Sequence, residues 1–230
     1  MNSPAVLSSK VGRRPFITLK LATSLDGKIA LANGQSEWIT SERSRAQGRR
    51  LRSEHDAIAI GANTAVLDNP QLTTRIAGRP DPQRVIFDSR LRVSPQSNLA
   101  KTARDIPVLL FHDAALKTEA SPLKDMGVFL LPIARTSKGL DVAEALSVLR
   151  NRGIETLLVE GGGTLAASFL RLGVVDRIDW FRAPIILGGD GRNAVGDLRI
   201  EAMQDVFKLP RVHLSELGDD IYERYQRIET

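Results

Sequence analysis

Short apolar runs that end in turn-forming residues recur through most of this chain, and their order limits the possible folds more than any other feature. The runs are rich in β-branched and aromatic residues, as strands are, and several are apolar throughout, as parallel strands covered on both faces are. They are FITLKLA (16–22), DAIAIG (56–61), RVIFDS (84–89), VLLF (108–111), VFLL (128–131) and TLLVE (156–160). Because helical patterns lie between some of these runs, we predict an α/β sheet.

Helices are predicted where capping residues flank a helical pattern. Thr40 is predicted to cap a helix that runs from Ser41 to about Ser53. Asp141 is predicted to cap a second helix, whose apolar residues recur on one face. The segment TLAASFLRL is predicted to form a third helix, which Gly173 ends.

The last part of the chain alternates only roughly between apolar and polar residues. RIDWFRAPIIL (177–187) is predicted as one long strand, and VFKLPRVHLSEL (206–217) and DIYERYQRI (220–228) as an antiparallel pair. The predicted fold is therefore α/β, with a mixed, mostly parallel central sheet flanked by helices and with antiparallel C-terminal strands. Since no repeat or linker divides the chain, we expect a single domain over residues 15–230 and a flexible N-terminal arm over residues 1–14.

Composition argues against several classes of function. The chain has no cysteine, which excludes disulfides, thiol catalysis and cysteine-ligated zinc, and its 3 histidines are scattered, so we expect no metal site. The net charge of +5 comes without a basic block and aromatic residues are only 5% of the chain, so we expect no nucleic-acid partner, although the charge suits an anionic substrate. Neither a membrane span nor a secretory signal is recognisable, and we expect no membrane partner and a cytoplasmic location.

The sharpest chemical signal is a strand, glycine and helix unit, LLVE-GGG-TLAASFL (157–170). Glycines let a backbone approach a ligand closely, and the free N–H groups at a helix start attract phosphate. The spacing differs from the G-x-G-x-x-G of dinucleotide-binding folds, and a tight turn without a ligand is the alternative. Glu160 favours a binding site, because ligands of open α/β sheets gather at the carboxyl ends of strands.

Two loops and one helix face carry further candidates. The segment TSLDGKIALANGQSEWIT (23–40) is long and polar, which is typical of a ligand-holding loop, although a surface hairpin with Trp38 in the core is the alternative. In TAVLDNPQLTTR (64–75), Asp68 precedes an Asn-Pro turn, which its carboxylate would cap if it had no other role. Arg52, near the end of the first predicted helix, is placed to turn inward.

Segments in this order carry a resemblance: KLATSLDGKIALANGQSEWIT, LRSEHDAIAIGANTAVLDNPQLTTR, RVIFDSR, VEGGGTLAASFL and APIILGG. From about Phe16 onwards, the chain resembles the pyrimidine reductase of riboflavin biosynthesis. The resemblance implies a dihydrofolate-reductase-like fold and hydride transfer from NADPH to the ribosyl carbon of 5-amino-6-(5-phosphoribosylamino)uracil. In that family the reductase is often fused behind a zinc-dependent deaminase, whose signature this chain lacks, so we expect a separate deaminase in the pathway.

The resemblance also assigns roles to residues. For NADPH it implies contacts from Ala22, Trp38, Thr64, Asp68, Ser89, Gly162, Gly163, Thr164 and Leu165. For the substrate it implies contacts from Ser36, Arg52, Leu72, Arg75 and Glu160. Asp68, Glu160 and Lys20, in that order, are the candidates for handling protons or stabilising charge. Arg90 is the candidate partner for a 2′-phosphate, which would favour NADPH over NADH.

Members of that family are commonly dimers, so a homodimer is expected. Two alternatives stay open: a reductase of the same fold that acts on a pterin, dihydrofolate or another pyrimidine, and a nucleotide-binding regulatory module without turnover. Arg52 and Arg75 favour the phosphorylated pyrimidine, because forked donors suit phosphate. The presence of Asp68 and Glu160 argues against a module that has lost activity.

Overall fold

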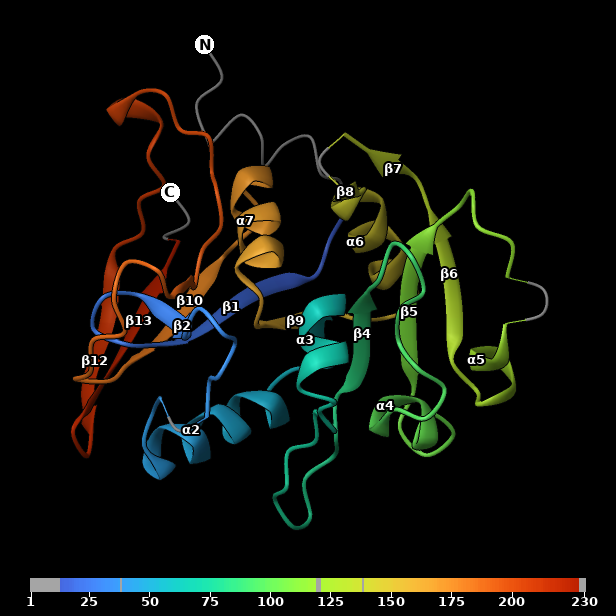
Figure 1. The fold of residues 1–230 in the computed structure, drawn as a ribbon, viewed down its shortest axis with the longest axis horizontal. Coiled ribbons are helices and arrows are strands. Elements are labelled where there is room, and N and C mark those ends of the chain that lie inside the picture. Colours follow the sequence, from blue (N-terminus) through green and yellow to red (C-terminus); the bar gives the residue numbers. More distant parts are fainter. Residues whose placement is uncertain (1–12, 38, 119–120, 138, 228–230) are drawn as a thin grey trace.

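A nine-stranded sheet organises the computed structural model, which describes residues 13–37, 39–118, 121–137 and 139–227 (Figure 1). In chain order its strands are β1 (Phe16–Thr23), β3 (Ala57–Gly61), β4 (Gln83–Phe87), β5 (Val108–Asp113), β6 (Phe129–Ile133), β9 (Thr156–Glu160), β10 (Arg177–Arg182), β12 (Arg211–Leu217) and β13 (Asp220–Gln226). Two short ribbons lie outside it: β2 (Lys28–Ala30) with β11 (Arg192–Asn193), and β7 (Arg135–Thr136) with β8 (Gly139–Leu140).

The strand order across the sheet is β12-β13-β10-β1-β9-β3-β4-β5-β6. All neighbours from β10 to β6 are parallel, whereas β13 is antiparallel to both β10 and β12. This arrangement confirms the predicted mixed, mostly parallel sheet with antiparallel C-terminal strands. It also brings the carboxyl ends of β1, β9 and β3 to one edge of the sheet.

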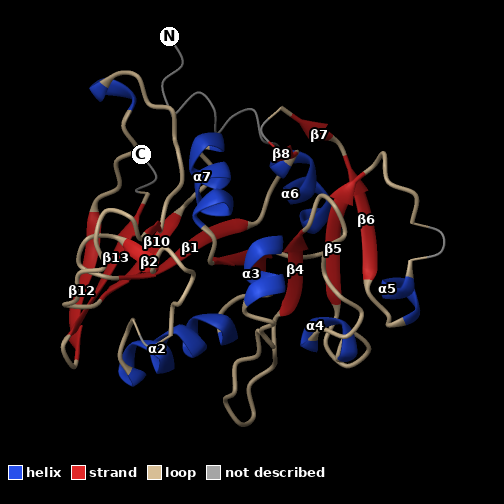
Figure 2. Cartoon of the chain, viewed as in Figure 1, coloured by secondary structure: helices blue, strands red, loops and turns tan. Residues whose placement is uncertain are grey.

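Helices cover both faces of the sheet (Figure 2). They are α2 (Glu42–Ser53), α3 (Ala62–Leu67), α4 (Asn98–Lys101), α5 (Pro122–Asp125), α6 (Val142–Asn151), α7 (Gly163–Leu172) and the 3₁₀ helix η1 (Met203–Asp205). Because side chains alternate along a strand, Ile17 and Leu19 of β1 pack with α6 and α7 on one face. On the other face, Leu51 of α2 packs with Ile58 of β3 and Phe181 of β10.

Capping residues set the ends of the main helices. Ser41, and not Thr40, caps α2, because the Ser41 hydroxyl accepts a hydrogen bond from the Ser44 N–H at 3.3 Å. The predicted caps of the other helices are confirmed: Asp141 accepts from Glu144 N–H, and Gly173 ends α7 in the left-handed conformation. The short helix α3 lies in the region where the sequence predicts only a turn.

Two predicted strands are shorter in the structure. β10 ends at Arg182 rather than continuing to 187, because the next segment leaves the sheet and bonds to the loop after β1. There, Leu25 N–H donates to Ile185 C=O, and the N–H groups of Leu187 and Gly188 donate to the Asp26 carboxylate. β12 begins at Arg211 rather than at 206, directly after a proline, which has no N–H to donate to the sheet.

The start of the sheet is tied down near the N-terminus. The guanidinium of Arg14 makes paired hydrogen bonds of 2.6 and 2.7 Å with the Asp176 carboxylate. Arg14 therefore belongs to the folded part, although the flexible arm was predicted to include it, and residues 1–12 of that predicted arm of residues 1–14 lie outside the described residues. In the part of the chain that is described, no helix has the length and apolar character that crossing a membrane requires.

Candidate functional site

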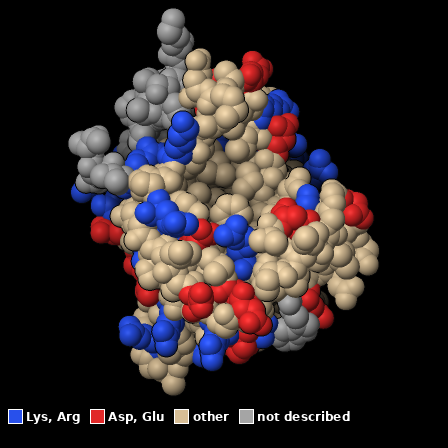
Figure 3. Space-filling view, turned by 90° about the vertical axis from the view of Figure 1, so that its left-hand side faces the viewer, with Lys and Arg blue, Asp and Glu red and all other residues tan. Residues whose placement is uncertain are grey.

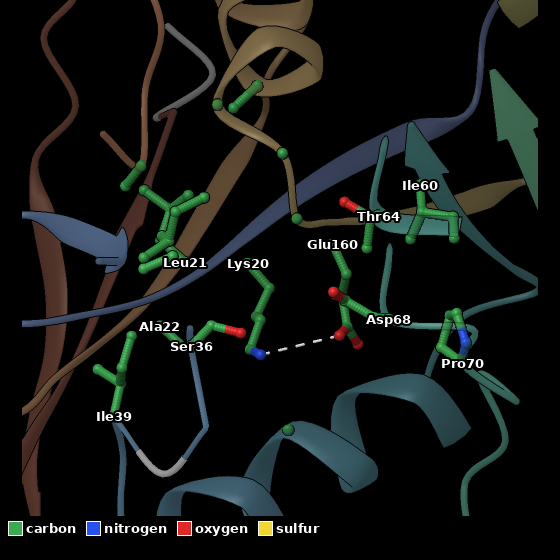
Figure 4. Close-up of a pocket in the computed structure, with 18 of the residues that line it drawn as sticks. Lys20, Leu21, Ala22, Ser36, Ile39, Ile60, Thr64, Asp68, Pro70 and Glu160 are labelled. Carbon is green, nitrogen blue, oxygen red and sulfur yellow. Dashed lines mark ion pairs between the residues drawn. The ribbon is translucent and has the colours of Figure 1, made fainter. Parts of the chain in front are cut away.

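A cleft of about 770 Å³ opens where β1, β3 and β9 end. Lys20 and Ala22 of β1 and Glu160 of β9 lie on one wall, together with the glycines that follow β9. Helix α2 and the loop after α3 form the opposite side (Figure 4). Figure 3 shows basic side chains around a hollow on one face of the molecule. The cleft is large enough for a nucleotide-sized ligand.

Glu160 is the centre of a buried charge cluster in this cleft. Its carboxylate accepts from Arg52 Nε at 2.8 Å and from Arg52 Nη2 at 2.9 Å, and Lys20 Nζ lies 3.7 Å from its Oε2 (Figure 4). The parallel register of β1 and β9 places Lys20 beside Glu160. Burial raises the pKa of Glu160, but the charges of Arg52 and Lys20 outweigh burial and bring the pKa down from 4.5 to about 2. Glu160 is therefore an anion at neutral pH.

Arg52 also links helix α2 to the loop that follows α3. Its Nη1 donates to the Thr73 carbonyl at 3.0 Å. Burial lowers the pKa of Arg52, but the Glu160 charge and the hydrogen bond to it raise the pKa overall, so the guanidinium keeps its charge. The prediction that Arg52 turns inward is confirmed. Its guanidinium is held in place by hydrogen bonds to Glu160 and to the Thr73 carbonyl, and it forms part of the wall of the cleft.

The backbone conformation of the turn after Glu160 explains why its residues are glycines. Gly161 and Gly162 have φ of 79° and 76°, in the left-handed region that side chains disfavour. A Cβ on Gly163 would lie 2.4 Å from the Asn193 carbonyl oxygen. Helix α7 starts here without a side-chain cap on its first N–H groups, which leaves donors for an anion. The segment is therefore a tight turn, as the alternative interpretation had it, and it also leaves backbone N–H groups that can donate to an anion.

Asp68 ends helix α3 at the rim of the cleft. Its carboxylate makes no hydrogen bond with another described residue, so it does not cap the Asn-Pro turn. The Asn69 side chain holds that turn instead, by accepting from the Asn98 N–H at 2.8 Å. Burial raises the pKa of Asp68, and the Arg192 charge opposes this with a smaller effect. Asp68 is therefore a weaker acid than a free aspartate, and at a given pH a larger share of it carries a proton that it can donate.

The loop after Asp68 is held in an uncommon backbone conformation. Asn69, Leu72 and Arg75 have φ of 41°, 59° and 52°, which is costly for a residue with a side chain. Leu72 is buried and packs into the core beneath the cleft. Arg75, in contrast, is exposed, lines the cleft, and forms no ion pair with any other described residue. Such strain is typical of loops that present groups to a ligand.

Arg192 also lines the cleft, although no sequence pattern predicts it there. It reaches the site because β11 pairs with β2. Its guanidinium packs against Gly34, and a Cβ added to Gly34 would lie only 2.8 Å from Arg192 Nη2. Gly34 therefore makes room for it. No local signal marks Arg192 as a site residue, since a ribbon of such short strands forms by contacts between distant segments.

A second cavity of about 200 Å³ adjoins the first at the glycine turn. Ser89, Leu165 and Arg92 line only this cavity, whereas Thr64 and Thr164 line both. Arg90, the expected partner for a 2′-phosphate, lies on the surface outside both cavities. Arg92 lines the smaller cavity, and its Nη2 donates to the Asn63 side chain at 2.8 Å.

Apart from Arg90, the described residues predicted to bind a cofactor or a substrate, or to be catalytic, line one of these two cavities. Those in the larger one are Lys20, Ala22, Ser36, Arg52, Thr64, Asp68, Leu72, Arg75, Glu160, Gly162, Gly163 and Thr164. Trp38 lies outside the described residues. The structure thus brings together residues from four separate sequence segments, while their individual roles stay predictions.

Comparison with known proteins places these observations in a family. A family model described as the RibD C-terminal domain matches residues 15–222. The riboflavin biosynthesis protein RibD of Aquifex aeolicus is 37% identical over 215 residues, which cover 93% of this chain and 58% of that protein. The 2,5-diamino-6-ribosylamino-4(3H)-pyrimidinone 5′-phosphate reductase of Methanothermobacter thermautotrophicus is 35% identical over 216 residues, covering 92% of this chain and 98% of that protein.

Solved structures agree with the sequence comparison. A structure of Acinetobacter baumannii RibD has a TM-score of 0.79 and 28% identity, and the match covers 94% of this chain and 59% of that one. The chain thus spans less than two thirds of the RibD proteins it matches. These matches confirm the resemblance found in the sequence: the chain belongs to the RibD C-terminal domain family.

Proposed function

We propose that this chain reduces 5-amino-6-(5-phosphoribosylamino)uracil to the ribitylamino product, with NADPH as the hydride donor. The observation that carries the proposal is the pair of adjoining cavities, which meet at an uncapped helix start and a buried Glu160–Lys20 pair. The larger cavity would hold the pyrimidine substrate beside the nicotinamide end of the dinucleotide, and the smaller one would hold the end that carries the 2′-phosphate. The Methanothermobacter relative, named as a ribosylaminopyrimidinone phosphate reductase, supports this substrate class.

The residues around the glycine turn fit NADPH. The free N–H groups at the start of α7 suit its pyrophosphate, and the neighbouring cavity with Arg92 suits a 2′-phosphate. When bound, NADPH supplies the hydride, and the protein orients the reacting carbon and excludes water. Arg92 takes the role that the sequence analysis assigned to Arg90.

The charged groups in the cleft divide the proton chemistry between them. Reduction requires the bond between the ribosyl carbon and its ring oxygen to break, with a proton added to that oxygen and a positive charge shared with the attached nitrogen. The Glu160 carboxylate would stabilise this positive charge, because it is ionised and buried. Lys20 or Asp68 would supply the proton, since the Lys20 ammonium lies beside Glu160 and burial raises the pKa of Asp68.

Two arginines are available for the substrate phosphate. Arg75 and Arg192 line the cleft and have no ion-pair partner among the described residues, whereas Arg52 is engaged by Glu160. We therefore assign the phosphate to Arg75 and Arg192, and Arg52 to the shape of the cleft. Both are exposed enough to exchange water for a phosphate without leaving a buried charge unpaired.

Arg75→Ala tests this assignment. The KM for the pyrimidine substrate is expected to rise roughly tenfold to a hundredfold, because a charge-assisted hydrogen bond is lost. The Kd for NADPH, measured by fluorescence titration, should change little. Arg79→Ala is the matched control, since Arg79 is an exposed arginine close by in the chain that does not line the cleft. Equal KM values in both variants would place the phosphate elsewhere.

The proposed function itself is tested by following NADPH oxidation with 5-amino-6-(5-phosphoribosylamino)uracil. The same assay with the 2,5-diamino pyrimidinone analogue shows whether reduction precedes deamination, as the name of the Methanothermobacter relative suggests. Dihydrofolate is the third substrate. A preference for dihydrofolate would replace the proposal by a folate-type reductase, and cofactor binding without turnover on any of the three would favour a regulatory module.

A homodimer and a cytoplasmic location remain predictions. The outer strand β12 supports the dimer, because it is the last strand of the sheet and carries the exposed apolar side chains of Val212 and Leu214 on one face. Edges of this kind commonly pair with another chain. Sedimentation equilibrium measures the mass in solution directly.

A further inference from the structure

Gly48 lies inside helix α2 on the side that faces the cleft, and the usual reasons for a glycine are missing there. Its backbone is not in the left-handed region, so other residues fit it equally well. A Cβ at this position would meet only the end of Lys20, 3.7 Å from Cε and 3.9 Å from Nζ, among the described residues. These are ordinary contacts. Because glycine weakens a helix interior relative to alanine, its presence here needs another cause.

The other cleft glycines show the contrast. Gly161 and Gly162 need a positive φ, and a side chain on Gly163 would collide with the Asn193 backbone. Gly34 leaves space for the Arg192 guanidinium. At Gly48 the protein itself leaves room for a methyl group, and this room opens into the cleft beside Lys20. The space is therefore available to a ligand.

Contacts near both ends of helix α2 hold it against the rest of the protein, so a shift of the helix away from Lys20 would break them. Near its start, the Ser44 hydroxyl donates to the buried Asp220 carboxylate at 2.5 Å. Near its end, Arg52 makes two hydrogen bonds to Glu160. Ser44, Gly48 and Arg52 follow at intervals of four residues, so they lie on one face of the helix. A side chain added at 48 would narrow the cleft rather than displace the helix.

We infer that Gly48 is a specificity-determining residue. Because it has no side chain, it leaves space between α2 and Lys20 for the ribosylamino part of the substrate. The inference rests on the proposed function, because it takes Lys20 and Glu160 to lie at the reacting carbon. It adds that the width of the cleft at Gly48, and not only the charges, selects the substrate. Glycine at this position makes helix α2 less stable than alanine would.

The test is Gly48→Ala, with Gln47→Ala as the control in the same helix, since Gln47 does not line the cleft. Gly48→Ala is expected to raise Tm by about 1–4 °C, because alanine favours the helix. It should also raise the KM for the pyrimidine substrate roughly tenfold to a hundredfold, as one extra methyl group in a fitted site does. The Kd for NADPH should stay within about twofold, because the cofactor is assigned to the glycine turn.

The outcomes separate this inference from the proposed function. If the wild-type protein turns over the substrate and Gly48→Ala gains stability with an unchanged KM, the role of Gly48 is wrong while the function stands. If the wild-type protein has no turnover on the pyrimidine substrates, both fall together. A rise in KM in the Gln47→Ala control equal to that in Gly48→Ala would also overturn the inference, because the effect would then belong to the helix and not to the cleft.

Discussion

Replacing Glu160 by glutamine is expected to lower kcat by about 10²–10⁴-fold. Glutamine has nearly the same shape and keeps one acceptor oxygen, but it removes the negative charge that faces Lys20 and Arg52. The positive charge that develops on the opening sugar would then meet two cations with no anion to balance them. The KM for the substrate and the Kd for NADPH should change less than kcat, which steady-state kinetics and fluorescence titration measure separately.

The same variant has a stability signature that depends on pH. In the folded protein the pKa of Glu160 lies at about 2, below its ordinary 4.5. A lowered pKa means that the folded state favours the anion of Glu160. The contribution of this carboxylate to the free energy of unfolding is therefore complete above about pH 4.5 and is lost as pH falls towards 2. Its size is about 3 kcal/mol. Urea unfolding at pH 6 and at pH 3 should therefore show a smaller loss on acidification in Glu160→Gln than in the wild type.

Glu155→Gln is the matched control. Glu155 is exposed and forms an ion pair with Arg150, and such a surface pair contributes little to stability. Its removal should leave both kcat and the pH dependence of unfolding close to those of the wild type. Wild-type turnover in Glu160→Gln would contradict the role of the carboxylate, even if the change in stability were found.

Replacing Asp68 by asparagine is expected to lower kcat by about 10²–10⁴-fold, while the Kd for NADPH stays within roughly tenfold. Asparagine keeps the shape but has no acidic proton to give. Burial raises the pKa of Asp68, so a larger share of the wild-type enzyme carries that proton at a given pH. The activity of the wild type should fall as rising pH removes this proton, and the pH profile of kcat should lose that limb in Asp68→Asn.

Asp190→Asn is the control for charge alone, because Asp190 is an exposed aspartate outside both cavities. It should behave as the wild type does. A kcat for Asp68→Asn that matches the wild type would leave Lys20 as the remaining proton donor. In that case the order of the catalytic candidates given by the sequence analysis would be wrong.

Much of the fold follows from local patterns. The apolar runs and the caps at Asp141 and Gly173 predict the central strands and the two helices on one face, since these signals depend on neighbouring residues. The error at Thr40 arises because Ser41 is an equally good cap, and the choice depends on Asp220, which accepts from the Ser41 N–H. That contact joins residues that are far apart in the chain.

The site was predictable as a group of residues but not as a set of contacts. Glu160 at a strand end and the glycines after it predict where a ligand would bind. The pairing of Glu160 with Lys20 depends on strand register, and Arg192 reaches the cleft through the ribbon of β2 and β11. Register and long-range pairing are decided by the whole fold, which is why the pairing of Arg52 with Glu160 could not be predicted from the sequence.

A crystal structure with NADPH and the ribosylaminouracil phosphate, or a substrate analogue that cannot react, tests the central claim most directly. The account predicts the pyrophosphate against the N–H groups at the start of α7, and the ribosyl carbon between the nicotinamide and the Glu160–Lys20 pair. It also predicts the substrate phosphate near Arg75 and Arg192. A dinucleotide bound away from Gly161–Gly163, or a substrate outside the cleft, would contradict it.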